Sequence, residues 1–164
     1  MHQRAEELIT ILRLQPHEEG GHFAEIFRSR HRVRPVDPPA GPPDRSALTT
    51  IYFLLAAGEV SRWHRLDADE TWHFYEGEPL ELFLLDGKAQ ILSRLRLGPR
   101  GSGTAPVHVV PAHSWLAARP AGAYALVGCT MGPGFEAAGF TLMSDEPAAA
   151  DEVRRRFPDL AGLL

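Results

Sequence analysis

Short apolar segments separated by turn residues fill the middle of this chain, and they limit the folds open to it. Side chains alternate between two faces of a β-strand, so such segments predict strands rather than helices. Asp86 followed by Gly87 predicts a tight hairpin turn. The predicted strands cover 47–55, 60–66, 69–75, 80–85, 89–97, 106–110, 114–119, 123–130 and 135–143. Such a series of short strands predicts a double-sheet jelly roll or a small barrel.

The two ends of the chain have a different pattern. Apolar residues at helical spacing predict a short helix over 4–13, and a second helix is expected over 147–157. Residues 22–30 alternate like a strand, whereas 31–46 contain five prolines and are expected to form a loop. With 164 residues, the chain is expected to form one domain over 1–164.

Charge and cysteine content exclude several classes of protein. The net charge is −4 and the arginines are scattered, so no basic stripe for nucleic acid is expected. No apolar run approaches the roughly 20 residues that a membrane-spanning helix needs, so no membrane partner is expected. Cys129 is the only cysteine, and no signal peptide precedes the domain, which predicts a reducing, cytoplasmic location.

Four residues in the first half of the strand region share a recognisable spacing. Gly58, His64, Glu70 and Gly77 fit the pattern G-x5-H-x-H-x3-E-x6-G, with Leu66 in place of the second histidine. Five further segments occur in order: PHEEGGHF from 16, TIYFLL from 50, SRWHRLDADETWHF from 61, VVPAHSW from 109 and LVGCTMGPGF from 126. Together they resemble the cupin family DUF985, also called cupin type 5, over roughly residues 5–160.

The resemblance implies a fold more firmly than an activity. It implies an all-β cupin double-stranded jelly-roll barrel with short N- and C-terminal helices and a pocket in the barrel mouth. It also implies a homodimer. Since no activity is settled for this family as a whole, the function has to be argued from the site residues.

A tightly bound metal is not expected. The resemblance to metal-dependent cupins implies three histidines and one carboxylate, of which only His64 and Glu70 are present. Leu66 and Leu116 stand at the other two positions. Two protein ligands are fewer than catalytic metal sites usually have. A weakly held divalent metal on His64 and Glu70 stays open.

The polar residues predict acid–base chemistry instead. A carboxylate beside an imidazole raises its basicity, so His64 and Glu70 are predicted to act as a catalytic pair. Tyr52 and Glu25 are candidate acids for the opposite side of a substrate. This set predicts a metal-independent enzyme of the sugar isomerase or epimerase type.

The pocket itself is expected to be mostly apolar, as small-molecule sites usually are. Its predicted ligand-contacting residues are Phe27, Leu66, Trp72, Phe74 and Leu116. They favour a small-molecule ligand with a hydrophobic portion, or a small organic acid held by one arginine. Two other functions stay open: a non-catalytic ligand-binding cupin that acts as a sensor or carrier, and a metal-dependent cupin with unusual ligands.

Overall fold

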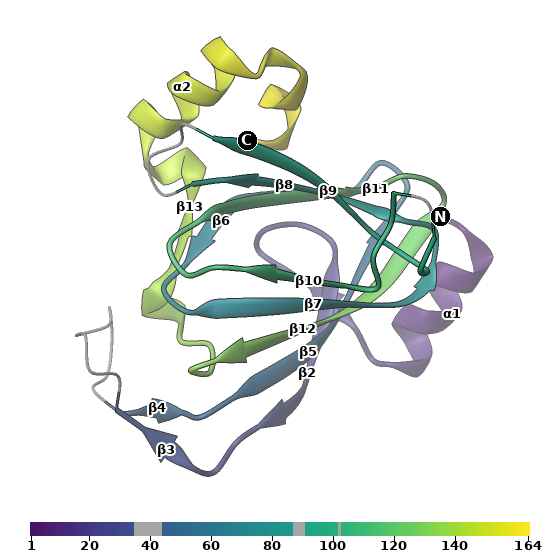
Figure 1. Cartoon of the computed structure of the whole chain (residues 1–164). Helices are drawn as coiled ribbons and strands as arrows, with labels where there is room; N and C mark the ends of the chain where they lie inside the picture. The colour runs from purple at the N-terminus through teal and green to yellow at the C-terminus, as the bar shows by residue number, and fades with distance from the viewer. Residues whose placement is uncertain (35–43, 87–90, 102) are drawn as a thin grey trace.

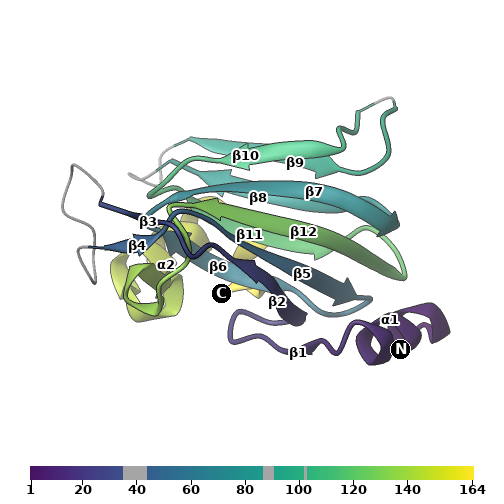
Figure 2. The same ribbon diagram turned by 90° about the horizontal axis from the view of Figure 1, so that it is seen from below.

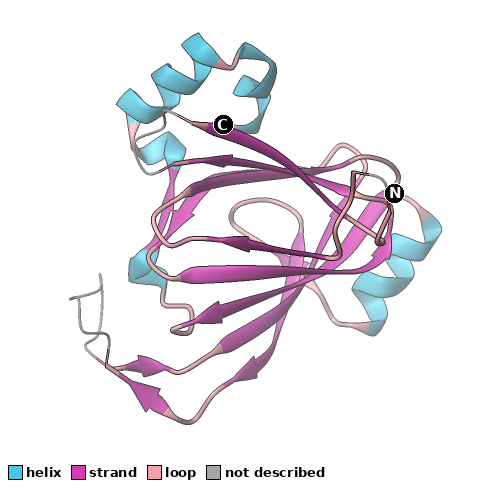
Figure 3. Ribbon diagram, viewed as in Figure 1, coloured by secondary structure: helices cyan, strands magenta, loops and turns pink. Residues whose placement is uncertain are grey.

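Two antiparallel β-sheets face each other in the computed structural model, which describes residues 1–34, 44–86, 91–101 and 103–164 (Figures 1 and 3). The larger sheet has the order β1-β2-β5-β12-β7-β10, and the smaller one has the order β13-β6-β11-β8-β9. Figure 2 shows them as two layers. From β5 to β8, successive strands alternate between the two sheets, which is the wrapping expected of a jelly roll.

The strands have the following bounds. The six-stranded sheet contains β1 (Gln15–Pro16), β2 (His22–Arg28), β5 (Thr49–Ala56), β7 (Asp69–Gly77), β10 (Val107–Val110) and β12 (Tyr124–Gly132). The five-stranded sheet contains β6 (Ser61–Leu66), β8 (Leu80–Leu85), β9 (Leu92–Leu97), β11 (Trp115–Pro120) and β13 (Phe140–Leu142). A separate pair is formed by β3 (Arg32–Val33) and β4 (Arg45–Ser46).

Helices cover the outer faces of both sheets. At the N-terminus, α1 (Gln3–Ile11) packs Ala5 and Leu8 against Leu54 and Leu126 of the six-stranded sheet. At the other end, α2 (Pro147–Arg156) and the 3-10 helix η3 (Pro158–Leu163) lie on the five-stranded sheet (Figure 1). Two further 3-10 turns, η1 (Ala137–Gly139) and η2 (Met143–Asp145), flank β13. Among the described residues, no helix has the length and hydropathy of a membrane span.

The main core lies between the sheets. It is built from inward-facing side chains of both, including Phe53, Trp72, Leu82, Leu116 and Val127. Their burial follows the period-2 alternation that the sequence predicts. The predicted all-β jelly roll with short terminal helices is therefore confirmed.

The structure corrects some element boundaries. Residues 135–143 were expected to form one strand, but only Phe140–Leu142 is extended, between η1 and η2. The expected loop 31–46 contains β3 and β4, while its five prolines lie outside the described residues. The tight turn expected after Asp86 also lies outside them, although the hairpin partners β8 and β9 pair as predicted from Leu85 opposite Leu92.

Candidate functional site

A cavity of about 300 Å³ opens between the two sheets beside the loop that joins β1 to β2. Its walls are mostly apolar and aromatic, and its polar side chains include one histidine, one threonine and four glutamates. The residues around it are His17, Glu18, Glu19, Phe23, Glu25, Thr49, Ile51, Phe53, Leu66, Glu70, Trp72, Cys129, Met131, Phe135 and Phe140. This composition is that of a small-molecule site.

The loop between β1 and β2 brings Glu19 into this cavity. Gly20 has φ +113°, and a Cβ there would lie 2.0 Å from the carbonyl oxygen of Val60. Only glycine fits a left-handed conformation at such a close approach. The loop is fastened to β6 because the amide of Arg62 donates a 2.8 Å hydrogen bond to the carbonyl oxygen of Glu19. The Glu19 side chain is thereby held in the barrel interior.

The Glu19 carboxyl group is 6% exposed and has three polar neighbours. The Ser61 hydroxyl donates a 2.9 Å hydrogen bond to Oε1. Nε2 of His64 lies 3.3 Å from Oε2, and Nδ1 of His17 lies 3.7 Å from the same oxygen. Burial raises the pKa of Glu19 to about 7, although His17 and the Ser61 hydroxyl oppose the shift. Near neutral pH, this carboxyl group can therefore hold or release a proton.

A β-bulge in β6 turns Ser61 and His64 toward the same carboxyl group. His64 pairs with Leu116 of β11, whereas Ser61 pairs with Ala118, and the register shifts between them. Without the bulge, residues three apart on a strand would face opposite sides. The extra residue therefore lets both side chains reach Glu19.

The tautomer of His64 follows from its backbone contact. Its Nδ1 lies 2.8 Å from the carbonyl oxygen of Arg62, so Nδ1 carries the proton and Nε2 is the free acceptor that faces Glu19. Burial lowers the pKa of His64, although the negative charge of Glu70 opposes the shift. The ring also stacks on Phe140, at 5.6 Å between centroids. His64 is thus held as a neutral imidazole behind the cavity wall.

Glu70 supplies the second buried carboxyl group of the cavity. It lies on β7, where Nε1 of Trp72 donates a 2.6 Å hydrogen bond to its Oε2. Burial raises the pKa of Glu70 to about 7, with His64 opposing the shift. The same burial, together with the charges of Glu70 and Glu19, raises the pKa of the Cys129 thiol, which is therefore held in its unreactive protonated form.

The residues predicted from the sequence fall in four places. Glu25, Leu66, Glu70 and Trp72 line the cavity as expected. Phe74 and Leu116 belong to the core between the sheets. His64 lies behind the cavity wall. Among the described residues, the carboxylate within ion-pairing distance of its ring is that of Glu19, not that of Glu70 as expected.

Tyr52 and Phe27 lie on the outer face of the six-stranded sheet. Thr49, Ile51 and Phe53 point into the cavity, so the alternation of β5 turns Tyr52 outward, next to Tyr75. Phe27 is 54% exposed, because a bulge in β2 pairs it with the outward-facing Thr50. The predictions that Tyr52 is an acid in the pocket and that Phe27 contacts the ligand are therefore wrong, because neither side chain lines the cavity.

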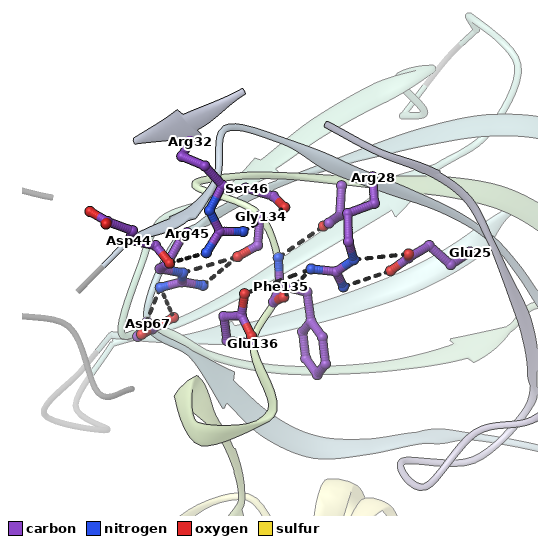
Figure 4. A network of polar contacts seen from close by, with 11 residues as sticks. Glu25, Arg28, Arg32, Asp44, Arg45, Ser46, Asp67, Gly134, Phe135 and Glu136 are labelled. Carbon is purple, nitrogen blue, oxygen red and sulfur yellow. Dashed lines mark hydrogen bonds and ion pairs between the residues drawn. The ribbon is translucent and has the colours of Figure 1, made fainter. Parts of the chain in front are cut away.

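Glu25 has the partner that its position requires. Arg28 donates two hydrogen bonds to its carboxylate, at 3.0 and 2.7 Å, and a third to the carbonyl oxygen of Phe135 (Figure 4). Both side chains of the Glu25–Arg28 pair are more than a third exposed. The charge of Glu25 is thus compensated by Arg28, and Glu25 is not buried as Glu19 and Glu70 are.

Comparisons with known proteins agree on the family. A profile described as the cupin superfamily family DUF985 matches residues 6–143. The chain belongs to this family. A hypothetical protein from Leishmania major is 29% identical, with a TM-score of 0.82 over 97% of this cupin and 95% of that chain. A protein from Shewanella oneidensis is 31% identical, with a TM-score of 0.80 over 99% and 95%.

A more distant neighbour supports the fold alone. A cupin 2 conserved barrel domain protein from Rhodopseudomonas palustris is 12% identical, with a TM-score of 0.58 over 92% of this cupin and 85% of that chain. No curated protein matches this cupin. The chemistry of the cavity therefore has to be argued from its own residues.

The metal positions of the cupin pattern converge in this structure. His64, Leu66, Glu70 and Leu116 all line one small space that leaves no room for a water molecule. Hydrocarbon occupies the places of two ligands, and among the described residues no group of three or more histidine, cysteine, aspartate or glutamate side chains could hold a metal ion. These residues do not fit a resident metal with three protein ligands.

The double variant Leu66→His, Leu116→His tests that interpretation. Because both leucines border the space beside His64 and Glu70, the variant is expected to bind one nickel or manganese ion per chain, whereas the wild type releases the ion on dialysis. Elemental analysis of tag-free protein measures the metal content. The single variant Leu66→His is the control and should retain less metal. Wild-type protein that retains one ion per chain would refute the interpretation.

Sequence reasoning missed Glu19 and gave His17 no role. Both lie in the PHEEGGHF segment, which the sequence analysis used only as part of the family resemblance. A hint was present: a Glu-Gly-Gly sequence before a strand permits a loop that presses close against a neighbouring backbone. Which side chain such a loop buries depends on its tertiary contact with β6, and no sequence periodicity reports that contact.

Proposed function

We propose that this cupin is a metal-independent, isomerase-type enzyme that transfers a proton within a small carbonyl compound, with Glu19 as the proton carrier. The observation that carries the proposal is the buried Glu19 carboxyl group, which opens on the cavity and lies 3.3 Å from Nε2 of His64. With its pKa raised to about 7, it is poised to accept a proton and then return it.

The step needs no co-reactant. Ionised Glu19 takes a proton from the carbon next to the substrate carbonyl, and the electron pair of that C–H bond moves into an enolate. The protonated carboxyl then returns the proton to another atom of the same molecule. Ser61 holds one carboxyl oxygen by its hydrogen bond, and the free Nε2 of His64 faces the other oxygen. His64 is therefore a positioning residue, because it does not line the cavity.

The cavity walls suit such a reaction. Phe53, Trp72 and Phe140 give the cavity apolar walls beside the two carboxyl groups, and apolar surroundings strengthen electrostatic interactions. The predicted His64 and Glu70 pair is modified in one respect: Glu19 takes the role of proton carrier, and Glu70 is left to contact the substrate. The homodimer and the cytoplasmic location stay predictions.

Proton exchange with solvent deuterium tests the proposal. The full-length protein in D₂O is incubated with neutral aldoses and ketoses, their phosphate esters, and α-amino ketones, and the loss of each α-proton signal is followed by proton NMR. The wild type is expected to exchange at least one class, and Glu19→Gln to reduce that rate about 100-fold. Glu81→Gln is the control, since Glu81 pairs with Arg119 on the outer side of the barrel, away from the cavity.

The pH profile adds a second readout. Because Glu19 must be ionised to take a proton, the exchange rate should rise with pH up to about 7 and then level off. Absence of exchange by the wild type across the whole panel would refute the proposal. A compound that binds without exchange would instead favour the non-catalytic sensor or carrier.

A further inference from the structure

The charges around the cavity have one sign. Glu18, Glu19, Glu25 and Glu70 line it together with His17, and among the described residues no lysine or arginine does. A cleft lined by one sign of charge attracts ligands of the opposite sign and repels others. The small organic acid held by an arginine, which the sequence favoured, has no arginine to hold it there.

The two exposed glutamates lie beside arginines. Glu25 is ion-paired with Arg28, whereas Arg62 donates a hydrogen bond to the backbone oxygen of Glu18 and not to its carboxyl group. The two buried carboxyl groups differ from these. Glu19 has only imidazole groups within ion-pairing distance, and Glu70 has no ion-pair partner among the described residues. Among the described residues, the two buried carboxyl groups are therefore the ones without an ion-paired arginine or lysine.

Glu70 is also the carboxyl group with a free oxygen. Its Oε2 accepts the hydrogen bond from Trp72, while Oε1 has no hydrogen-bond partner among the described residues. The side chain is 6% exposed and lines the cavity, so this oxygen is available to a bound molecule. By contrast, both oxygens of Glu19 face polar neighbours, Ser61 on one side and the two histidines on the other.

Aromatic rings surround the same space. Five of them line the cavity: Phe23, Phe53, Trp72, Phe135 and Phe140. The faces of such rings attract ammonium groups, most strongly when the cation is withdrawn from water, and they also bury the apolar part of a ligand. A carboxylate beside an aromatic enclosure is the arrangement that favours an organic amine over a neutral or anionic compound of the same shape.

We propose that the cavity binds an organic cation, namely an ammonium group carried on an apolar or aromatic body, with Glu70 as the carboxylate that holds the charge. The inference builds on the proposed function, since it assigns a substrate class to the same cavity and leaves Glu19 free to move the proton. It excludes phosphosugars and sugar nucleotides, whose phosphates would face buried carboxyl groups with no cation beside them.

Three probes of the same size and different charge test the inference. Benzylamine, benzyl alcohol and benzoate are titrated into the full-length protein at pH 8 and constant ionic strength, and binding is followed by calorimetry and by tryptophan fluorescence. Benzylamine is expected to bind at least tenfold more tightly than benzyl alcohol, and benzoate to give no measurable binding. Glu70→Gln should reduce the preference for the amine about tenfold, whereas Glu81→Gln should leave it unchanged.

Three other binding results would overturn the inference. Benzyl alcohol or benzoate binding as tightly as benzylamine, or no binding of benzylamine at all, would contradict a cation site. An undiminished preference for the amine in Glu70→Gln, with its fold confirmed by thermal unfolding, would remove Glu70 from the site. A preference for the amine without any deuterium exchange would refute the proposed catalysis and leave this inference standing.

Discussion

Replacing Asp67 with alanine is expected to destabilise the fold by about 3–5 kcal/mol, the range found when one partner of a buried ion pair is removed. Nη1 of Arg45 lies 2.9 Å from both carboxylate oxygens of Asp67. The side chain of Arg45 is 1% exposed and that of Asp67 is 9% exposed. Without the carboxylate, the guanidinium would remain buried with only a backbone partner.

That remaining partner is the carbonyl oxygen of Gly134, which accepts hydrogen bonds from Nε and Nη2 of Arg45 at 3.0 and 2.6 Å (Figure 4). The network joins β4, the turn between β6 and β7, and the segment after β12. Phe135, the next residue, lines the cavity. Loss of the network is therefore expected to loosen one wall of the candidate site as well as the fold.

Urea unfolding followed by tryptophan fluorescence measures the effect. Asp159→Ala is the matched control, because Asp159 pairs with Arg94 while both side chains are at least half exposed, and such surface pairs contribute little to stability. The double variant Arg45→Met, Asp67→Ala removes both buried charges and should be more stable than Asp67→Ala alone. Equal losses for Asp67→Ala and Asp159→Ala would contradict the prediction.

The Arg45 network and the bulges mark where prediction from the sequence reaches its limit. The G-x5-H-x-H-x3-E-x6-G spacing identified Glu70, and Trp72 lies two residues further along β7 and so on the same inward face. Bulges in β2 and β6 shift the alternation by one residue. The bulge in β2 places Phe27 on the outer face of the sheet, and the bulge in β6 brings Ser61 to the same side as His64. Neither bulge contains a glycine that would have indicated it in the sequence.

Long-range contacts set the remaining features. Tyr52 lies on β5, whose residues are buried or half-buried on both faces, and α1 covers one end of its outer side. The apolar pattern of β5 therefore does not tell inside from outside. Glu19 reaches the cavity only because its loop is bonded to β6, which begins more than forty residues later. Such contacts depend on how the two sheets stack, and a single sequence does not encode that arrangement in any local period.

Glu70→Gln is expected to stabilise the protein at pH 8 by up to about 3 kcal/mol and to leave its stability unchanged at pH 4. Burial raises the pKa of Glu70 from 4.5 to about 7, so between these values the folded protein holds a proton that the unfolded chain has lost. Wild-type stability therefore falls as pH rises from about 4.5 to about 7. Glutamine is neutral throughout, and its oxygen can still accept the hydrogen bond of Trp72.

Chemical unfolding of both proteins at several values between pH 4 and pH 8 gives the difference directly, and Glu81→Gln supplies a control at an ion-paired surface site. A difference that does not change with pH, or a Glu70→Gln variant less stable than wild type at pH 8, would show that Glu70 does not hold its proton on folding. At neutral pH the Glu70 carboxyl group lowers stability, although a glutamine would fit in its place. The demands of folding therefore do not explain why a glutamate stands there. Its burial beside a cavity is explained if Glu70 meets a positive charge there, because a bound cation would compensate the energy that folding alone leaves unfavourable.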